Sequence, residues 1–272
     1  GCYQGGISVL NTVDGHSKEI TQYPANILAL QPKNMKYRYN WNAPLIASPH
    51  DPKVIYHAAQ VVFKTMDGGL TWSKISTDLT RNDTLKQDLG GAPITNEGAG
   101  GENYNTISYL IESTLEKGVM YAGSDCGLVH VTRDGGNSWQ AITPQGLEEC
   151  LINSIDVSPH AAGTAYIAAT RYKFNDFSNM CFKTTDYGKT WSKINQGIRS
   201  DDFIRVIRED KKVKNLLYGG AERGFYISYD GGNQWNLFQL NLPVVPITDI
   251  AFADNDLVVS TAGRSFWILD DI

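Results

Sequence analysis

The 272-residue chain has little charge and no excess of basic residues. Only 19% of its residues are charged, and 24 basic against 29 acidic side chains give a formal net charge of −5. Proteins that bind nucleic acid need a basic surface, so we expect no nucleic-acid partner. The chain also lacks a run of the roughly 20 apolar residues that a membrane-spanning helix requires. We therefore predict a soluble segment without membrane insertion.

Signatures of metal binding and catalysis are absent as well. The chain has no Walker loop, no Gly-x-Ser-x-Gly and no His-Glu-x-x-His motif. Its cysteines show no C-x-x-C spacing, which argues against a zinc or redox site; they are Cys2, Cys126, Cys150 and Cys181. We predict no metal and no cofactor. Buried thiols are the expected state, and a bridge between Cys126 and Cys150 stays open for an oxidising compartment.

Glycine and aromatic residues are abundant instead, which is typical of short strands joined by tight turns. Four segments, 65–72, 132–139, 184–191 and 228–235, share the pattern S/T-x-D-x-G-x-T-W, the second with Ser and the last with Gln in place of the second Thr. In a tight turn Asp accepts bonds from backbone N–H groups, Gly adopts positive φ and Trp buries its ring. We predict structural roles for the Asp and Trp residues of these turns: Asp67, Trp72, Asp134, Trp139, Asp186, Trp191, Asp230 and Trp235.

Each of these segments follows a β-branched or aromatic strand, with two more strands before it, so the repeat unit is four antiparallel strands. Such a repeat of about 40–50 residues is a β-propeller blade. We predict an all-β propeller with complete blades at about 40–80, 105–145, 150–197 and 203–240. At 1–30 and 245–272 the four-stranded repeat is incomplete, so we predict partial blades there. We therefore expect part of a larger propeller, which packs against the remainder of a longer polypeptide.

The four segments resemble the bacterial neuraminidase repeat, or Asp-box, of sialidases, xyloglucanase-type glycosidases, sortilin-like receptors and photosystem assembly propellers. Over nearly its whole length the chain looks like one branch: large secreted bacterial proteins with sortilin-like repeats, often labelled glycosyl hydrolases. The segments that carry this closer match are 41–44, 100–105, 171–173, 240–243 and 263–271. The resemblance implies a secreted or cell-surface propeller, while the Asp-box itself specifies a fold and no activity.

The resemblance also implies that ligands bind at the blade ends opposite the Asp-box turns. The loops there supply the predicted ligand-binding residues, Glu102, Tyr104, Arg171, Tyr172, Glu222, Arg223 and Arg264. Arginines can hold a carboxylate or phosphate in a bidentate manner, or they can pair with acidic groups of a neighbouring blade. The long interblade loop 76–105 can form a pocket wall or an ordered packing loop. His50 and His160 follow Ser-Pro in equivalent turns, so we expect a structural role for both.

Three functions stay open. The leading hypothesis is a binding scaffold for a peptide, protein or glycan. The second is a glycoside hydrolase, sialidase-like or xyloglucanase-like, with part of its site outside this segment; no spacing singles out the carboxylates or the Tyr nucleophile that it needs, so no catalytic residue is predicted. The third is a structural subunit of a surface assembly.

Overall fold

The computed structural model describes residues 5–25, 30–89 and 102–272; the rest of the predicted first blade and of the loop 76–105 lies outside the described residues. The helical turns in the described part are short 3₁₀ turns, η2 (Pro32–Asn34), η3 (Thr84–Lys86) and η4 (Tyr172–Phe174). None of them is long enough to cross a membrane. The chain divides into two compact units, unit 1 (Gly1–Ala141) and unit 2 (Ile142–Ile272).

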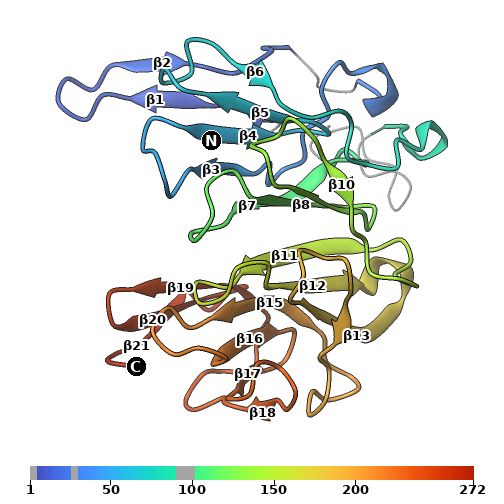
Figure 1. Ribbon diagram of the computed structural model, residues 1–272, viewed down its shortest axis with the longest axis vertical. Helices are drawn as coiled ribbons and strands as arrows, with labels where there is room; N and C mark the ends of the chain where they lie inside the picture. The colour runs from blue at the N-terminus through green and yellow to red at the C-terminus, as the bar shows by residue number, and fades with distance from the viewer. Residues whose placement is uncertain (1–4, 26–29, 90–101) are drawn as a thin grey trace. The chain divides into compact units, whose positions relative to one another are not determined.

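Unit 1 contains antiparallel sheets in which neighbours in the chain pair with each other (Figure 1). The first sheet has two strands, β1 (Ser8–Leu10) and β2 (Ser17–Glu19). The second has four: β3 (Leu45–Ala47), β4 (Ile55–Ala58), β5 (Val62–Thr65) and β6 (Ser73–Lys74). The third also has four: β7 (Ile107–Glu112), β8 (Met120–Ser124), β9 (Val129–Thr132) and β10 (Gln140–Ala141).

Unit 2 repeats this architecture. One four-stranded sheet comprises β11 (Leu151–Val157), β12 (Ala165–Arg171), β13 (Asp176–Thr184) and β14 (Ser192–Lys193). The next comprises β15 (Ile204–Glu209), β16 (Leu217–Ala221), β17 (Phe225–Ser228) and β18 (Asn236–Leu237). A three-stranded sheet of β19 (Ile247–Ala253), β20 (Asp256–Thr261) and β21 (Phe266–Leu269) follows (Figure 1).

The strand register gives every four-stranded sheet two different ends. The connections from the first to the second strand and from the third to the fourth lie at one end, which we name the turn end. The connections from the second to the third strand, and the loops that lead to the next sheet, lie at the opposite end, which we name the loop end. In the sheet of β11–β14, Thr184 pairs with Ala165 at the turn end and Asp176 pairs with Arg171 at the loop end.

The four repeated turns have the same hydrogen bonds at the turn end. In the turn of 132–139, the Asp134 carboxylate accepts bonds from the Ser138 backbone N–H at 2.9 Å and the Ser138 hydroxyl at 2.6 Å. The Thr132 hydroxyl donates to Asp134 at 2.8 Å and accepts from the Gly136 N–H at 3.0 Å. The turns at Asp67 and Asp186 repeat this arrangement with Thr71 and Thr190. At Asp230 the bonds of the Ser228 hydroxyl and of the Gln234 backbone N–H remain, and the second hydroxyl bond is missing because Gln234 replaces the hydroxyl residue.

Each repeated turn also bonds to an isoleucine 41–64 residues earlier in the chain, and within unit 1 and within unit 2 this contact joins neighbouring sheets. The indole N–H donates to the carbonyl of the isoleucine that directly follows the last strand of the preceding sheet, in the pairs Trp72–Ile20, Trp139–Ile75, Trp191–Ile142 and Trp235–Ile194, at 2.6–2.8 Å. The glycine two residues after the Asp of each turn packs on the same isoleucine; a Cβ there would lie 2.4–2.8 Å from its side chain, at Gly69, Gly136, Gly188 and Gly232. We name this contact the Trp–Gly–Ile latch.

The core of each unit lies between neighbouring sheets. In unit 1, Tyr56 and Val62 of one sheet pack with Ile107 and Met120 of the next. The histidines of the two Ser-Pro-His turns join sheets as well: His50 contacts the Ser113 carbonyl in unit 1 at 2.8 Å. His160 contacts the Asp210 carbonyl in unit 2 at 2.7 Å, so the two turns make the same contact.

Unit 2 buries a carboxyl group between two first strands. Asp156 of β11 is 9% exposed, and its Oδ2 accepts a bond from the Glu209 backbone N–H of β15 at 2.7 Å. Burial raises the pKa of Asp156 to about 6, although the nearby Arg208 guanidinium favours the charged form.

Candidate ligand-binding site

The first strand of each sheet in unit 2 carries a β-bulge close to its loop end. The register shifts between Ile152 and Ser154, between Ile204 and Val206, and between Ile247 and Asp249. The bulged residues are Asn153, Arg205 and Thr248; each is partly or fully exposed, while the residues before them are buried. Bulges re-aim side chains and are common beside functional sites. These three residues are therefore the first components of a candidate site.

Each bulged side chain is bonded to the second strand, or the loop that follows it, in its own sheet. The Thr170 hydroxyl donates to the Asn153 side chain. The Arg205 guanidinium donates from Nε at 2.7 Å and from Nη2 at 2.6 Å to Glu222 Oε2. The hydroxyls of Thr248 and Ser260 are 2.7 Å apart. We name these three contacts the bulge pairs.

The three bulges lie on neighbouring first strands. Residues of β15 donate hydrogen bonds to both neighbouring first strands: the Ile207 backbone N–H donates to the Ser154 hydroxyl of β11 at 3.3 Å. Arg208 Nε donates to the Ile250 carbonyl of β19 at 3.2 Å, and its Nη2 donates to Asp249 at 2.6 Å. The bulge pairs therefore form a row across three neighbouring sheets at one end of unit 2.

Aromatic rings surround the middle of this row. The Tyr172 ring is stacked on Phe203 with centroids 5.8 Å apart, and Phe177 contacts Phe203 at 6.2 Å. The Arg205 guanidinium lies 5.0 Å from the Tyr172 centroid and 5.1 Å from that of Phe203. Phe203 is buried whereas Phe177 is 49% exposed, so the cluster reaches from the core to solvent. We name Tyr172, Phe177, Phe203 and Arg205 the aromatic cluster.

The length of one hairpin explains why these rings are exposed. β13 extends well beyond β14, which pairs only with Phe182 and Lys183. The register shifts between Ala169 and Arg171, and the hairpin then turns through η4, with Asn175 in the left-handed region at φ 59°. In this turn Phe174 is 38% exposed, and the Arg171 guanidinium lies 5.7 Å from the centroid of its ring.

The predicted arginines of unit 2 have carboxylate partners in most cases. Arg171 pairs with Glu148 and lies 3.7 Å from Asp176. Arg223 pairs with Asp201 at 3.3 Å, and its backbone N–H donates to the buried Asp202 at 2.9 Å. These carboxylates come from the arginines' own blade or from the loop that leads into it, rather than from a neighbouring blade, and ligand binding by Arg171 and Arg223 stays a prediction.

Two further features define the charge at this end. Burial raises the pKa of Asp202, which accepts a bond from the Tyr226 hydroxyl at 3.0 Å. Arg264 lies in the β20–β21 turn, where its backbone bonds to Thr261 and Trp267; among the described residues it makes no ion pair. Tyr172 belongs to the aromatic cluster and Glu222 bonds to its Arg205, whereas Arg171 lies over the ring of Phe174 and, within the described ranges, Arg264 bonds only inside its own turn.

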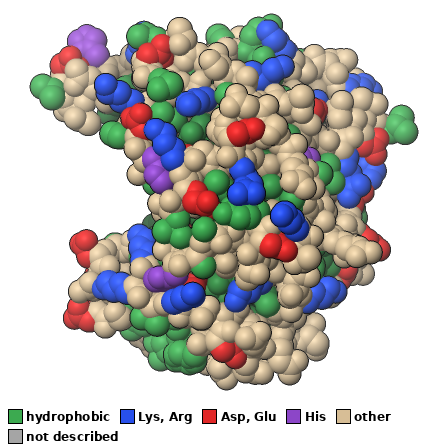
Figure 2. All heavy atoms as spheres, viewed as in Figure 1, with side chains coloured by type: hydrophobic (Ala, Val, Ile, Leu, Met, Phe, Trp, Pro, Cys, Tyr) green, Lys and Arg blue, Asp and Glu red, His purple; other side chains and the backbone are tan. Residues whose placement is uncertain are grey.

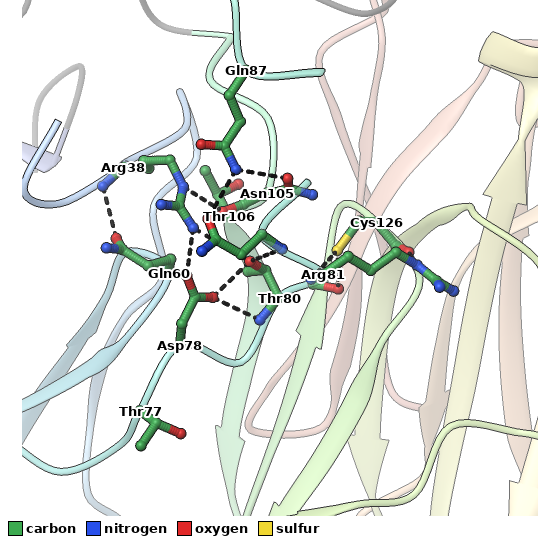
Figure 3. Close-up of polar contacts among 12 residues, drawn as sticks. Arg38, Gln60, Thr77, Asp78, Thr80, Arg81, Gln87, Asn105, Thr106 and Cys126 are labelled. Carbon is green, nitrogen blue, oxygen red and sulfur yellow. Dashed lines mark hydrogen bonds and ion pairs between the residues drawn. The ribbon is translucent and has the colours of Figure 1, made fainter. Parts of the chain in front are cut away.

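The predicted interblade loop of unit 1 is anchored by a buried polar cluster (Figure 3). Arg38, 5% exposed, donates from Nη2 to Asp78 at 2.6 Å and from Nε to the Asn105 carbonyl at 3.1 Å. The buried Gln87 donates to the Asn105 side chain at 2.8 Å. Arg81 Nε donates to the Cys126 carbonyl at 2.8 Å. The described part of this loop therefore packs on the body of unit 1.

The two predicted residues of this loop lie beside the same cluster. Glu102 accepts a bond from the Trp41 indole N–H and forms an isolated bridge with Asn40. Tyr104 is half-buried, between the fully buried Asn103 and Asn105. Trp41 is 39% exposed, so Glu102 orients an exposed ring at the surface of unit 1.

The described residues hold no cluster of His, Cys, Asp and Glu that could bind a metal. Cys126, Cys150 and Cys181 are buried thiols. Burial raises the pKa of Cys126 and Cys181, which disfavours the reactive thiolate at neutral pH. Their place in the cores of the units agrees with a packing role.

The site contains residues that the sequence reasoning did not identify, namely Phe203, Arg205, Asn153 and Thr248. One signal for the bulged residues was present. Each first strand of unit 2 has, as its first or second residue, an isoleucine followed by a polar residue, at Ile152, Ile204 and Ile247. The same pair occurs in unit 1 at Ile107 and Ser108, where the register also shifts.

Comparisons with known proteins agree with this geometry at the level of the fold. No protein-family model and no curated protein match the chain. An ancestral GH74 enzyme is similar in structure over 88% of this chain and 30% of its own length, with a TM-score of 0.62 and 18% identity. The GH74 enzyme of Niastella koreensis matches over 98% of this chain and 44% of its own length, with a TM-score of 0.57 and 14% identity.

A further match is the extracellular domain of BT4673 from B. thetaiotaomicron, with a TM-score of 0.60 and 12% identity over 97% of this chain and 30% of that one. The chain has the β-propeller fold. Its four-stranded sheets are the blades. The chain spans less than half of the length of each of these three proteins, and identities this low show the fold alone.

Proposed function

We propose that this chain is the Asp-box part of a secreted or cell-surface propeller of the sortilin-like branch, and that it binds a peptide, protein or glycan ligand. The observation that carries the proposal is the row of bulge pairs beside the aromatic cluster at the loop end of unit 2. Ligand sites combine exposed aromatic surface with a few fixed polar groups, and both are present there.

The distribution of chemistry within the blades supports this proposal. At the turn end, the Asp and Trp side chains are used for turn bonds and latches, and the same bonds recur from blade to blade. At the loop end, the residues differ from blade to blade, which is what a site on a repeated scaffold requires. The secreted location is proposed from the resemblance and from the likeness to an extracellular domain.

Peptide and oligosaccharide arrays test the proposed function. The full chain should bind at least one class, and Tyr172→Ala should weaken that binding by about tenfold, since removing an aromatic anchor costs on the order of 1–2 kcal/mol. The matched control is Tyr229→Ala, which removes a 68% exposed tyrosine at the turn end of the same unit. Equal losses in the two variants, or no bound ligand for the wild-type chain, would exclude a site at the aromatic cluster.

A further inference from the structure

The charges in the row of bulge pairs point to a class of ligand. The row contains an amide–hydroxyl pair, a guanidinium–carboxylate pair and a hydroxyl–hydroxyl pair, formed by Asn153 with Thr170, Arg205 with Glu222, and Thr248 with Ser260. Each pair contains both hydrogen-bond donors and acceptors, and none has a net charge. Basic and acidic side chains are also interspersed over the visible face of unit 2 (Figure 2).

The Arg205–Glu222 pair, in the middle of the row, determines whether the row can bind a charged ligand. Arg205 and Glu222 have side-chain exposures of only 19% and 32%, and both bonding nitrogens of the guanidinium contact the same carboxylate oxygen. An anionic ligand would have to compete with this carboxylate and leave it partly buried and unpaired, which is costly. The site therefore disfavours carboxylate and phosphate ligands, although it contains an arginine.

Hydroxyl groups fit this row because each of them both donates and accepts. A chain of sugar units can bond to all three pairs without separating any of them. The rings of Tyr172 and Phe177 provide apolar surface for the C–H faces of a sugar beside the middle pair. A peptide would instead offer backbone groups in a fixed alternation and, in most sequences, charged side chains.

We propose that the loop end of unit 2 binds an uncharged oligosaccharide, and that Glu222 sets this specificity by neutralising Arg205. This inference rests on the proposed binding function, because it names the ligand class of the same site. Glu222 is a specificity-determining residue in this proposal, and Arg205 is the group whose charge it masks.

The test uses immobilised oligosaccharides in pairs that share length and linkage, one member built from hexoses and the other from the corresponding hexuronic acids. Mannose with mannuronate, glucose with glucuronate and galactose with galacturonate give three such pairs. The wild-type chain should bind an uncharged member more tightly than its uronate partner. Glu222→Gln should change the ratio by about tenfold or more in favour of the uronate, because the Arg205 guanidinium loses its carboxylate.

Two further variants make the result specific. Asp201→Asn also releases arginines, Arg199 and Arg223, but these are about 60% exposed, and the binding ratio should stay at the wild-type value. The double variant Arg205→Gln/Glu222→Gln removes both charges and should keep the preference for the uncharged sugar. Thermal midpoints show that each variant is folded.

The outcomes separate the two proposals. A wild-type preference for uronates or for peptides, or an unchanged ratio in Glu222→Gln, would overturn the specificity proposal and leave the binding function standing. If the wild-type chain binds no peptide and no oligosaccharide, the proposed function itself fails.

Discussion

The turn end and the loop end of the same blades differ in how much they vary. At the turn end, four turns in two units repeat the same bonds and the same latch, with one substitution, Gln234. At the loop end, the bulge recurs but its residue changes from Ser108 to Asn153, Arg205 and Thr248. The backbone conformation is thus repeated at both ends of the blades, whereas the side-chain contacts are repeated only at the turn end. Stability should therefore respond to changes at the turn end, and binding to changes at the loop end.

The largest expected effect is at a latch. Trp235 is 1% exposed and bonds to the Ile194 carbonyl. Trp235→Ala should lower the free energy of unfolding by about 4 kcal/mol, because it opens a cavity and leaves a buried carbonyl unpaired. Urea unfolding measures this loss. A loss below about 1 kcal/mol would contradict the importance of the latch.

The buried carboxyl at the turn end gives a pH-dependent effect. Since the pKa of Asp156 is about 6 against an ordinary value of 3.8, the folded state holds the proton more tightly than the unfolded state does. Its stabilisation is complete below about pH 4 and is lost as the pH rises through 6, by up to about 3 kcal/mol. Asp156→Asn should remove this loss. Urea midpoints at pH 4 and pH 7 test it; an identical pH dependence in the two proteins would contradict the prediction.

Two neighbouring glycines separate backbone strain from packing. Gly135 and Gly136 both have positive φ, but a Cβ on Gly136 would lie 2.8–2.9 Å from Ile75, whereas a Cβ on Gly135 would meet nothing within 4 Å. Gly135→Ala should cost about 1 kcal/mol for the left-handed backbone alone. Gly136→Ala should cost roughly 2 kcal/mol more, because the latch must open. Thermal unfolding of both variants measures the difference, and equal losses would mean that the glycine–isoleucine contact contributes nothing.

The turn aspartates should show the opposite pH dependence to Asp156. Bonds from Ser138 and Thr132 lower the pKa of Asp134 to about 2. The contribution of this group is therefore present above about pH 4 and is lost as the pH falls through 2. Asp134→Asn should lower the thermal midpoint at pH 7 and have a much smaller effect near pH 2, where the group is already partly protonated. A larger effect at pH 2 would contradict the assignment.

The smallest stability effect is expected at the loop end. Phe177 is 49% exposed, and its ring is tilted against that of Phe203 with centroids 6.2 Å apart. Phe177→Ala should change the free energy of unfolding by about 0.5 kcal/mol or less, as is usual for a surface residue. Its binding to the ligand found on the arrays should weaken. If Phe177→Ala lowered the free energy of unfolding by more than it weakened the free energy of binding, Phe177 would belong to the core rather than to the site.

The turn end could be predicted from the sequence because its interactions are local. Asp134, Thr132 and Ser138 lie within seven residues, so one short pattern contains all the partners of the turn. The same pattern led to the fold class, because its spacing sets the length of a blade. The isoleucine of the latch is 64 residues from its tryptophan in the Trp139–Ile75 pair, and no local pattern connects them.

The loop end was only partly predictable, because its contacts also join residues that are far apart in the sequence. Tyr172 and Glu222 were identified by their place in loops, but Phe203 and Arg205, which join them, come from the start of the blade that contains Glu222. Whether Arg171 and Arg223 are free or paired depends on Glu148 and Asp201, whose positions follow from loop conformation. Loop conformation differs between blades, so repetition gave no help there.

The Trp–Gly–Ile latch has a consequence for how such a chain can grow in evolution. A blade such as that of β3–β6 carries Trp72 and Gly69 for the sheet before it and Ile75 for the blade after it. A tandem duplication of the gene segment for one blade would therefore supply the tryptophan, the glycine and the isoleucine of each new Trp–Gly–Ile latch at once. The number of blades can then change without the invention of a new interface, while each copy remains free to diverge in its ligand-facing loops.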